Sequence, residues 1–270
     1  MRLLWPVAAI TFKEGIRNRS IYGISLIALL MLVANFIISD MIGHDVGKVA
    51  VDIALSAVSF SGLLLVLFVG INLMAKDLDR KTIYMVLAKP ISRGQYIIGK
   101  FLGVTLLIVA CLGILSCFAA VSLLMIKLGH PNYFKGFSWP LVCLSFSFIM
   151  LMLILVSALS FLFASFTSTS FLTFILTVIS YIIGSSLNDV KALVEAPQAV
   201  GITVSPVTVK VVQVAYYLFP NLSFFDIKVQ AAHGLPIAPS YIGGVVLYSI
   251  VYTAIVITLA SLIFRKKEFP

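Results

Sequence analysis

Long runs of residues without a charge dominate the chain. Five of these uncharged windows are present, with lengths of 20, 23, 26, 53 and 36 residues, at 20–39, 53–75, 101–126, 136–188 and 229–264. A helix needs about 20 residues to cross the roughly 30 Å hydrocarbon core of a bilayer. Each charge at the centre of such a helix costs about 2.5 to 3.5 kcal/mol. Every window is therefore long enough to contain a membrane-spanning helix.

The fourth window is too long for one span. As a single helix at 1.5 Å per residue it would reach roughly 80 Å, more than twice the bilayer core. The Ser/Thr cluster at 165–170 is the natural turn between two spans, and the Gly and Pro residues at 234–239 place the start of the last span near Tyr241. The pattern predicts a single all-α integral membrane domain over 1–270, with spans at 20–39, 53–75, 101–126, 139–164, 169–188 and 241–264.

The basic residues predict an orientation for this six-span arrangement. Six spans place the N-terminus, the 76–100 connection and the C-terminus on one side, and that side receives thirteen of the 19 Lys and Arg residues. Connections with an excess of Lys and Arg remain in the cytoplasm. We therefore expect both termini and the 76–100 connection to be cytoplasmic, and the 189–240 segment to be external.

Composition supports a membrane domain and excludes several other classes. The chain is 61% hydrophobic and 11% charged, whereas a soluble domain carries about 25% charged residues. The net charge of +9 comes from basic residues that flank the apolar runs, so membrane topology explains it better than nucleic-acid binding does. The first nineteen residues lack a small-residue cleavage site, so we expect an amphipathic N-terminal helix over 1–19 and no signal peptide.

The 76–100 connection is the most informative polar segment. Acidic and basic residues alternate at 77–81, and apolar residues follow at helical spacing up to Leu87, before Pro90 and Ser92. This pattern predicts a short helix on the membrane surface. Two interpretations remain open, namely a solvated surface helix and a docking element for a cytoplasmic partner, because alternating charges give orientation-specific contacts.

A near-match to a phosphate-binding loop occurs between Gly94 and Phe101. It has two glycines and Lys100 at the required spacing, but Phe101 replaces the Ser or Thr that binds magnesium. A phosphate loop also follows a buried strand, whereas here an amphipathic segment precedes and a predicted span follows. We interpret it as the start of the third span, with Lys100 among the lipid headgroups.

The 189–240 segment contains an uncharged stretch at 211–225 that is rich in Val and aromatic residues. As a helix it would reach about 22 Å, which is too short to span the bilayer. We expect an external or re-entrant helix that lies against the outer leaflet and ends at Pro220 and Asn221. The alternative is an unstructured loop, which the apolar composition disfavours.

The predicted spans contain no Asp, Glu, Lys or Arg. This argues against a proton-coupled secondary transporter, which needs buried ionisable groups, and an apolar path suits lipid-like, amphipathic or hydrophobic cargo. No Ser/His, paired Asp or HExxH-like constellation lies at bilayer depth, so we expect no enzyme. His44, His130 and His233 fall in separate external connections, and we expect no metal site.

Four parts of the chain resemble the permeases of type 2 ABC exporters. The connection resembles their cytoplasmic loop through the acidic pair with Arg80 and Thr82, the run Leu87-Ala88-Lys89-Pro90-Ile91-Ser92-Arg93 and Gly99-Lys100. It departs from that family at Lys81, where Gly is usual. The segments 11–19 and 264–269 resemble the family's amphipathic N-terminal helix and its basic ending. The segment 217–226 resembles the stretch these permeases place between spans five and six.

This resemblance implies a prokaryotic inner-membrane permease that dimerises, with a second copy or a homologous permease, among membrane lipid. It pairs with two separate cytoplasmic ABC ATPase subunits that contain the ATP and magnesium, so no cofactor is expected in this chain. Residues implied to contact the ATPase are Glu14, Arg17, Asp77, Asp79, Arg80, Lys81 and Arg93, and those implied to form an external gate are Phe219, Pro220 and Asn221. The alternative function is a membrane scaffold or assembly subunit that does not transport.

Overall fold

The computed structural model describes residues 4–41, 45–74, 92–134, 136–195 and 205–266, and this part of the chain is almost entirely helical. Six helices are long and apolar enough to cross a membrane, which confirms the number of spans predicted from the uncharged windows. They are α2 (Ser20–Met41), α3 (Val46–Leu65) with its continuation to Met74, α6 (Arg93–Gly129), α7 (Trp139–Phe166), α8 (Ser170–Glu195) and α11 (Pro239–Lys266). Shorter helices are α1 (Leu4–Ile16), α9 (Pro206–Leu218) and α10 (Lys228–His233).

The helices extend beyond the uncharged windows. α3 begins at Val46 instead of 53, α6 at Arg93 instead of 101, and α8 continues to Glu195 instead of 188. Charged side chains end a window but do not end a helix, because they lie at the interface or against polar partners while the backbone remains helical. The segment 93–100, which precedes the predicted span at 101–126, is therefore part of α6.

The turn predicted inside the 53-residue window is present. α7 ends at Phe166, and the hydroxyl of Thr167 donates to the Phe163 carbonyl at 2.9 Å. The backbone N–H of Leu172 donates to the Thr169 hydroxyl at 3.3 Å, in the first turn of α8. The Thr169 hydroxyl satisfies a backbone N–H that the start of a helix leaves without a partner, and the Thr167 hydroxyl adds a second donor to a carbonyl in the last turn of α7. The Ser/Thr cluster therefore separates two spans.

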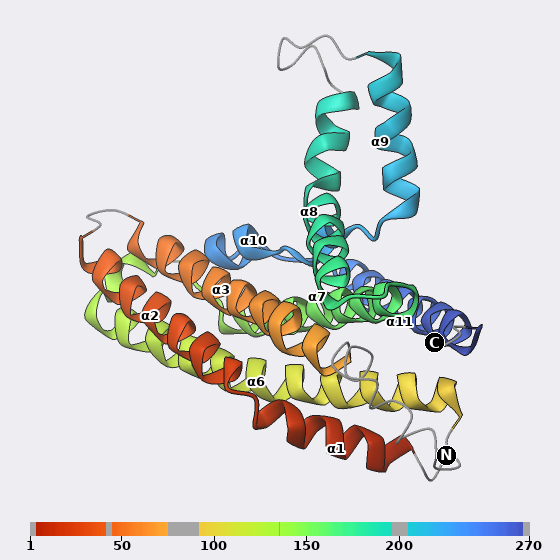
Figure 1. The fold of residues 1–270 in the computed structure, drawn as a ribbon. Helices are drawn as coiled ribbons and strands as arrows, with labels where there is room; N and C mark the ends of the chain where they lie inside the picture. Colours follow the sequence, from red (N-terminus) through yellow and green to blue (C-terminus); the bar gives the residue numbers. More distant parts are fainter. Residues whose placement is uncertain (1–3, 42–44, 75–91, 135, 196–204, 267–270) are drawn as a thin grey trace.

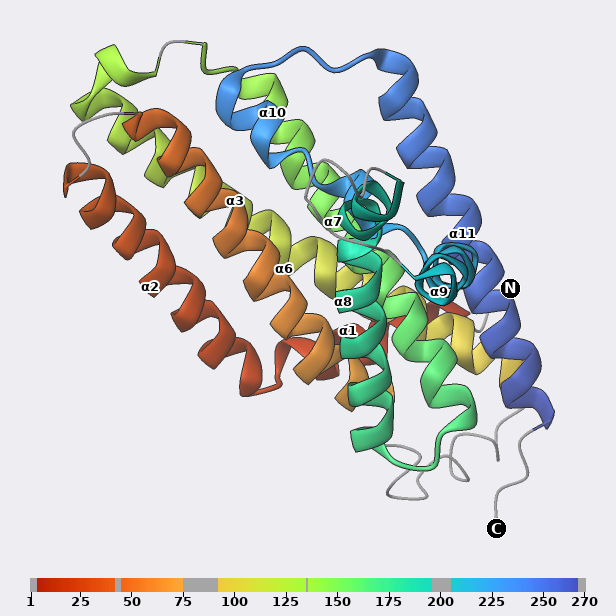
Figure 2. The same ribbon diagram turned by 90° about the horizontal axis from the view of Figure 1, so that it is seen from above.

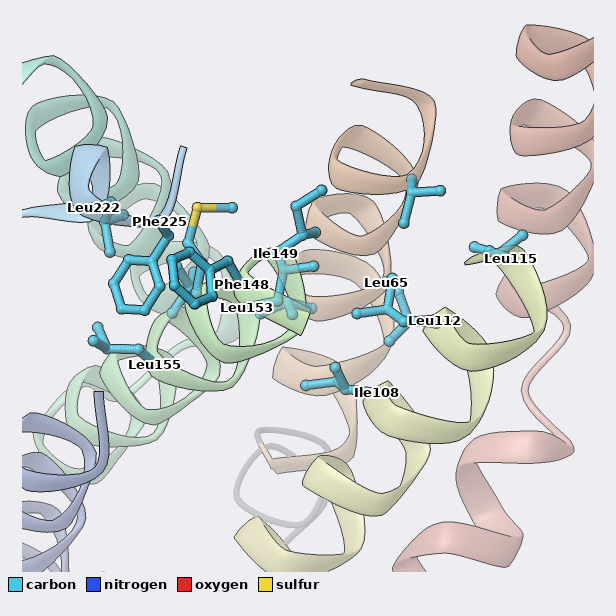
Figure 3. Close-up of a cluster of buried hydrophobic side chains, with 14 of the residues drawn as sticks. Leu65, Ile108, Leu112, Leu115, Phe148, Ile149, Leu153, Leu155, Leu222 and Phe225 are labelled. Carbon is cyan, nitrogen blue, oxygen red and sulfur yellow. The ribbon is translucent and has the colours of Figure 1, made fainter. Parts of the chain in front are cut away.

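The spans pack around a continuous apolar core. Figure 2 shows α2, α3, α7 and α11 across the molecule, with α6 crossing behind them. Core side chains come from α3, α6, α7 and the short 3₁₀ turn η4 (Leu222–Phe225), including Leu65, Leu112, Phe148 and Phe225 (Figure 3). A π-helical turn, η1 (Val66–Gly70), continues α3 toward Met74. The core thus joins the spans to the segment between α8 and α11.

The C-terminal part of α8 and the antiparallel α9 stand away from the other helices (Figure 1). The last fully buried residue of α8 is Leu187, and the ammonium of Lys191 lies 4.6 Å from the ring of Tyr216 on α9. The expected helix at 211–225 is present, but it runs from Pro206 to Leu218. It ends before Pro220 because proline lacks the N–H that continues a helix.

Candidate coupling region and polar cavity

Helix α1 lies along the N-terminal half of α6 at three glycines. A Cβ at Gly99 would lie 2.9 Å from the Cβ of Val7, and one at Gly103 would lie 2.6 Å from the Ala8 carbonyl oxygen. A Cβ at Gly15 would lie 2.5 Å from a methyl carbon of Leu107. Small residues four apart allow two helix backbones to approach closely in membranes. The spacing of Gly99 and Gly103 was readable in the sequence, but its partner helix was not.

These contacts also give the direction of α1. Val7 lies against Gly99 and Gly15 against Leu107, so α1 runs parallel to α6. The opposite face of α1 exposes Trp5, Ile10 and Ile16. One face of α1 therefore packs on the protein, while the uncovered side combines these apolar side chains with the exposed Lys13, which suits a helix at a lipid interface.

The structure separates the residues expected to contact an ATPase. Glu14 lies in the last turn of α1 and Arg17 directly follows that helix, both near Leu107 of α6, whereas Arg93 is the first residue of α6. The rise along α6 from Arg93 to Leu107 is about 21 Å. Asp77, Asp79, Arg80 and Lys81 lie outside the described residues. Their roles in coupling remain predictions, and a contact surface that includes Glu14 and Arg93 would have to extend along α6.

A capping box fixes the start of α6. The Ser92 hydroxyl accepts from the backbone N–H of Gln95 at 3.3 Å, and the Gln95 side-chain oxygen accepts from the Ser92 N–H at 3.1 Å. This reciprocal pair is a strong helix-start signal, and the sequence analysis missed it. Gly94 to Phe101 consequently form the first turns of a continuous helix. A phosphate loop, in contrast, is a loop between a strand and a helix.

The first turns of α6 contact the last turns of α11. The guanidinium of Arg93 donates to the Arg265 carbonyl at 3.4 Å, and the rings of Tyr96 and Phe264 stack with centroids 6.1 Å apart. A Cβ at Gly94 would lie 2.7 Å from the Ser261 hydroxyl oxygen. The C-terminal helix is therefore part of the same end of the bundle as the start of α6.

Lys100 is buried, with 4% of its surface exposed, and does not reach the lipid headgroups as the sequence suggested. Its ammonium donates to the Leu73 carbonyl at the end of α3 and lies 5.5 Å from the centroid of the Tyr96 ring. A positive charge near the C-terminal end of a helix is stabilised by the helix dipole. Lys100 thus connects the residues that precede and follow the 75–91 segment.

The expected gate residues lie between α9 and η4. Phe219 is half-buried, whereas Pro220 and Asn221 are buried. The Asn221 amide nitrogen donates to the Asn188 side-chain oxygen at 2.6 Å, and its backbone N–H donates to the Tyr248 hydroxyl at 2.9 Å. These bonds fix the segment to α8 and α11.

A polar cavity of about 640 Å³ lies beside this segment. Its walls come from the first turns of α3, the N-terminal half of α7, the C-terminal half of α8, the η4–α10 segment and the start of α11. The polar lining includes Asp52, Ser56, Tyr181, Asp189 and Asp226. All these helix ends lie at the end of the bundle opposite the start of α6. The sequence analysis did not anticipate the cavity, because Asp52 and Asp189 each stand one residue outside a predicted span.

No group of three or more His, Cys, Asp or Glu side chains that could hold a metal ion occurs among the described residues. The three aspartates of the cavity wall are therefore not arranged as a metal site. His130 instead lies 3.0 Å from a carboxylate oxygen of Asp40, and His233 contacts the Val229 carbonyl at 3.0 Å.

Six helices that are long and apolar enough to cross a bilayer, with a short N-terminal helix packed on the glycines of α6, define a multi-pass membrane protein. The chain belongs to the ABC-2 family transporter proteins, whose family model matches residues 5–269. It is a permease-type membrane subunit of an ABC transporter, with the multi-pass form of a bacterial inner-membrane protein. In this family ATPase activity lies in a separate subunit.

One curated relative is a probable ABC transporter permease protein NosY of Pseudomonas aeruginosa. The two chains are 27% identical over 155 residues, which covers 53% of this chain and 56% of the relative. The match thus spans little more than half of either protein. The match supports the same class of protein for both chains. It does not transfer the activity or the partners of the relative to this chain.

Proposed function

We propose that this chain is the permease subunit of an ATP-driven exporter of lipid-like, amphipathic or hydrophobic cargo, and that it has no ATPase activity itself. A second permease copy and two cytoplasmic ABC ATPase subunits complete the transporter, and ATP and magnesium bind in the ATPases. The two chain termini and the segment between α3 and α6 face the cytoplasm.

One observation carries this proposal, namely the convergence of four structural elements at the start of α6. α1 packs on Gly99 and Gly103, the end of α3 accepts the Lys100 bond, and the end of α11 contacts Arg93. These elements also flank the regions that contain most of the basic residues. A partner attached to the 76–92 segment would therefore act at once on α1, α3, α6 and α11.

The apolar surface of the spans is what contact with lipid requires, and a path along it would suit an apolar or amphipathic cargo. Large hydrophobic side chains are exposed along α2, α6 and α11, among them Leu30, Phe118 and Leu247. Lys100 is buried and hydrogen-bonded at one end of the bundle, and the aspartates of the cavity lie at the other. The middle of the bundle thus offers little to bind a small ion.

The test of the ATPase partnership is affinity purification in mild detergent, with identification of the subunits that co-purify. Reversing both charges in the connection, with Asp79→Lys and Arg80→Asp, should abolish recovery of the ATPase and its stimulation by the permease. The matched control is reversal of the Lys191 and Glu195 pair on α8, whose charged atoms lie 3.7 Å apart. Full recovery and stimulation with the first double variant would refute the proposed contact.

A scaffold subunit would share the fold and the ATPase partner, so transport must be measured separately. The purified complex in vesicles, supplied with ATP and magnesium, should move a fluorescent phospholipid analogue between leaflets. A complex that hydrolyses ATP but moves neither this probe nor a hydrophobic dye would favour the scaffold.

A further inference from the structure

The cavity beside η4 has a polar rim and an apolar floor. Ser56, Ser59 and Tyr181 lie on its walls, whereas Ile149, Met152, Leu222 and Phe225 form apolar parts of the lining. Leu222 and Phe225 each expose only 1% of their surface, and Figure 3 shows them beside Phe148 of α7. The floor is therefore part of the packed core, and the space above it is bounded by rigid elements.

The charges on the wall do not balance. Three carboxylates line the cavity against one ammonium, that of Lys228, which lies 4.0 Å from Asp226. Within the described part of the chain, the structure gives Asp52 and Asp189 neither an ion pair nor a hydrogen bond. Both are exposed and belong to different helices, α3 and α8. The cavity thus offers two carboxylates that remain available to an added positive charge.

The volume agrees with that of a small-molecule site. Ligand pockets measure about 300–1,000 Å³, and this cavity measures about 640 Å³. Hydroxyl groups of Ser56 and Tyr181 and the amide of Asn188 add hydrogen-bonding groups at the rim. A metal ion is a poorer fit, because the described residues contain no cluster of metal-binding side chains.

We propose that this cavity binds the cationic head of an amphipathic organic molecule, with the positive charge at the wall that Asp52 and Asp189 line and the apolar part against Ile149 and Leu222. The inference rests on the proposed function, since it names the class of cargo within it. A lone carboxylate attracts a cation weakly in water, whereas a cleft lined by several carboxylates with low-dielectric walls raises the local concentration of cations. An apolar floor adds affinity only for a ligand that also has an apolar part.

Binding of tetraphenylphosphonium to the full chain in lipid nanodiscs, without any ATPase, tests this proposal. The wild-type chain should bind the cation at least tenfold more tightly than the neutral triphenylphosphine oxide. Asp52→Asn and Asp189→Asn should each weaken cation binding about tenfold and leave the neutral probe unaffected. Glu195→Gln, on the same helix as Asp189 but outside the cavity, is the matched control and should bind the cation like the wild type.

Variants are compared only when they elute as the wild type does in size-exclusion chromatography, so that a folding defect is not mistaken for lost binding. Equal cation affinity in the wild type and both Asp variants, or equal affinity for the charged and neutral probes, would overturn the proposal. Failure of the proposed function can be distinguished from failure of this proposal, because the proposed function is tested by recovery of the ATPase and not by this binding assay.

Discussion

Gly103 determines how closely α1 can approach α6. A Cβ at this position would lie 2.6 Å from both the Ala8 carbonyl oxygen and the Thr11 Cβ, so one of the helices must shift. Forcing extra atoms into a packed contact costs typically about 1–3 kcal/mol. We therefore expect Gly103→Ala to lower the apparent unfolding temperature in mild detergent, measured by the loss of the monodisperse peak after heating.

Gly113 provides the control on the same helix, because a Cβ there meets nothing within 4 Å. Replacing a helical Gly by Ala without a clash favours the helix by roughly 1 kcal/mol. Gly113→Ala should therefore leave the unfolding temperature unchanged or raise it. Equal shifts for the two variants would show that close approach to α1 is not what Gly103 provides.

Lys100 is a second residue whose effect should be local and measurable. Lys100→Met retains most of the side-chain volume but removes the donor to the Leu73 carbonyl. A hydrogen bond made by a charged group contributes about 1.5–3 kcal/mol. Hydrogen–deuterium exchange should then become faster in η1 and the turn that follows it, at 66–74. Lys210→Met, at an exposed position on α9, is the control and should leave that exchange unchanged. Exchange at 66–74 that is as slow in Lys100→Met as in the wild type would exclude the role assigned to Lys100.

At the scale of elements, the hydrogen bonds of Asn221 should hold the segment before η4 in place. Asn221→Ala removes the bond to Asn188 and the bond that its side-chain oxygen accepts from the Ser223 N–H at 3.1 Å. The loss should amount to about 1–2 kcal/mol, and exchange at 219–227 should become faster. Asn132→Ala, at an exposed site in another connection, is the comparison. Unchanged exchange in Asn221→Ala would argue that the apolar contacts of Leu222 and Phe225 suffice.

The elements themselves were predictable from the sequence to different degrees. Uncharged length predicts six spans because lipid excludes charge from the middle of each helix. Helix ends were harder to predict, because an uncharged window ends at the first charged residue. The third window therefore begins after Lys100, although Ser92 and Gln95 form a capping box that starts α6 at Arg93. The placement of α1 on α6 could not be predicted, because Gly99 and Gly103 show that a close neighbour exists without saying which helix it is.

At the scale of the whole molecule, orientation remains a prediction from charge. In a variant without Cys111, Cys117 and Cys143, a single cysteine introduced by Lys191→Cys should react with a membrane-impermeant maleimide in intact cells. Lys266→Cys should react only after the cells are permeabilised, because it lies on the side that we expect to be cytoplasmic. Labelling in the opposite pattern would place the end of the bundle that contains the cavity on the cytoplasmic side.

The cavity is the feature that the sequence could least predict. It is assembled from five parts of the chain between Asp52 and Tyr241, and each part alone looks like the end of a span or a loop. In the sequence alone, Asp52 and Asp189 look like ordinary charged residues at the ends of spans. Only the folded arrangement shows that both belong to the lining of one space.

The parallel packing of α1 on α6 has a consequence for the order of events during synthesis. Val7 contacts Gly99, a residue that the ribosome adds roughly ninety positions later, which corresponds to about 5–20 s at ordinary elongation rates. Until then the face formed by Ala8, Thr11 and Gly15 lacks the helix on which it packs in the folded protein. Its apolar residues Trp5, Ile10 and Ile16 allow it to lie on the membrane surface until α6 has been made. The first helix to be made is thus among the later ones to be docked.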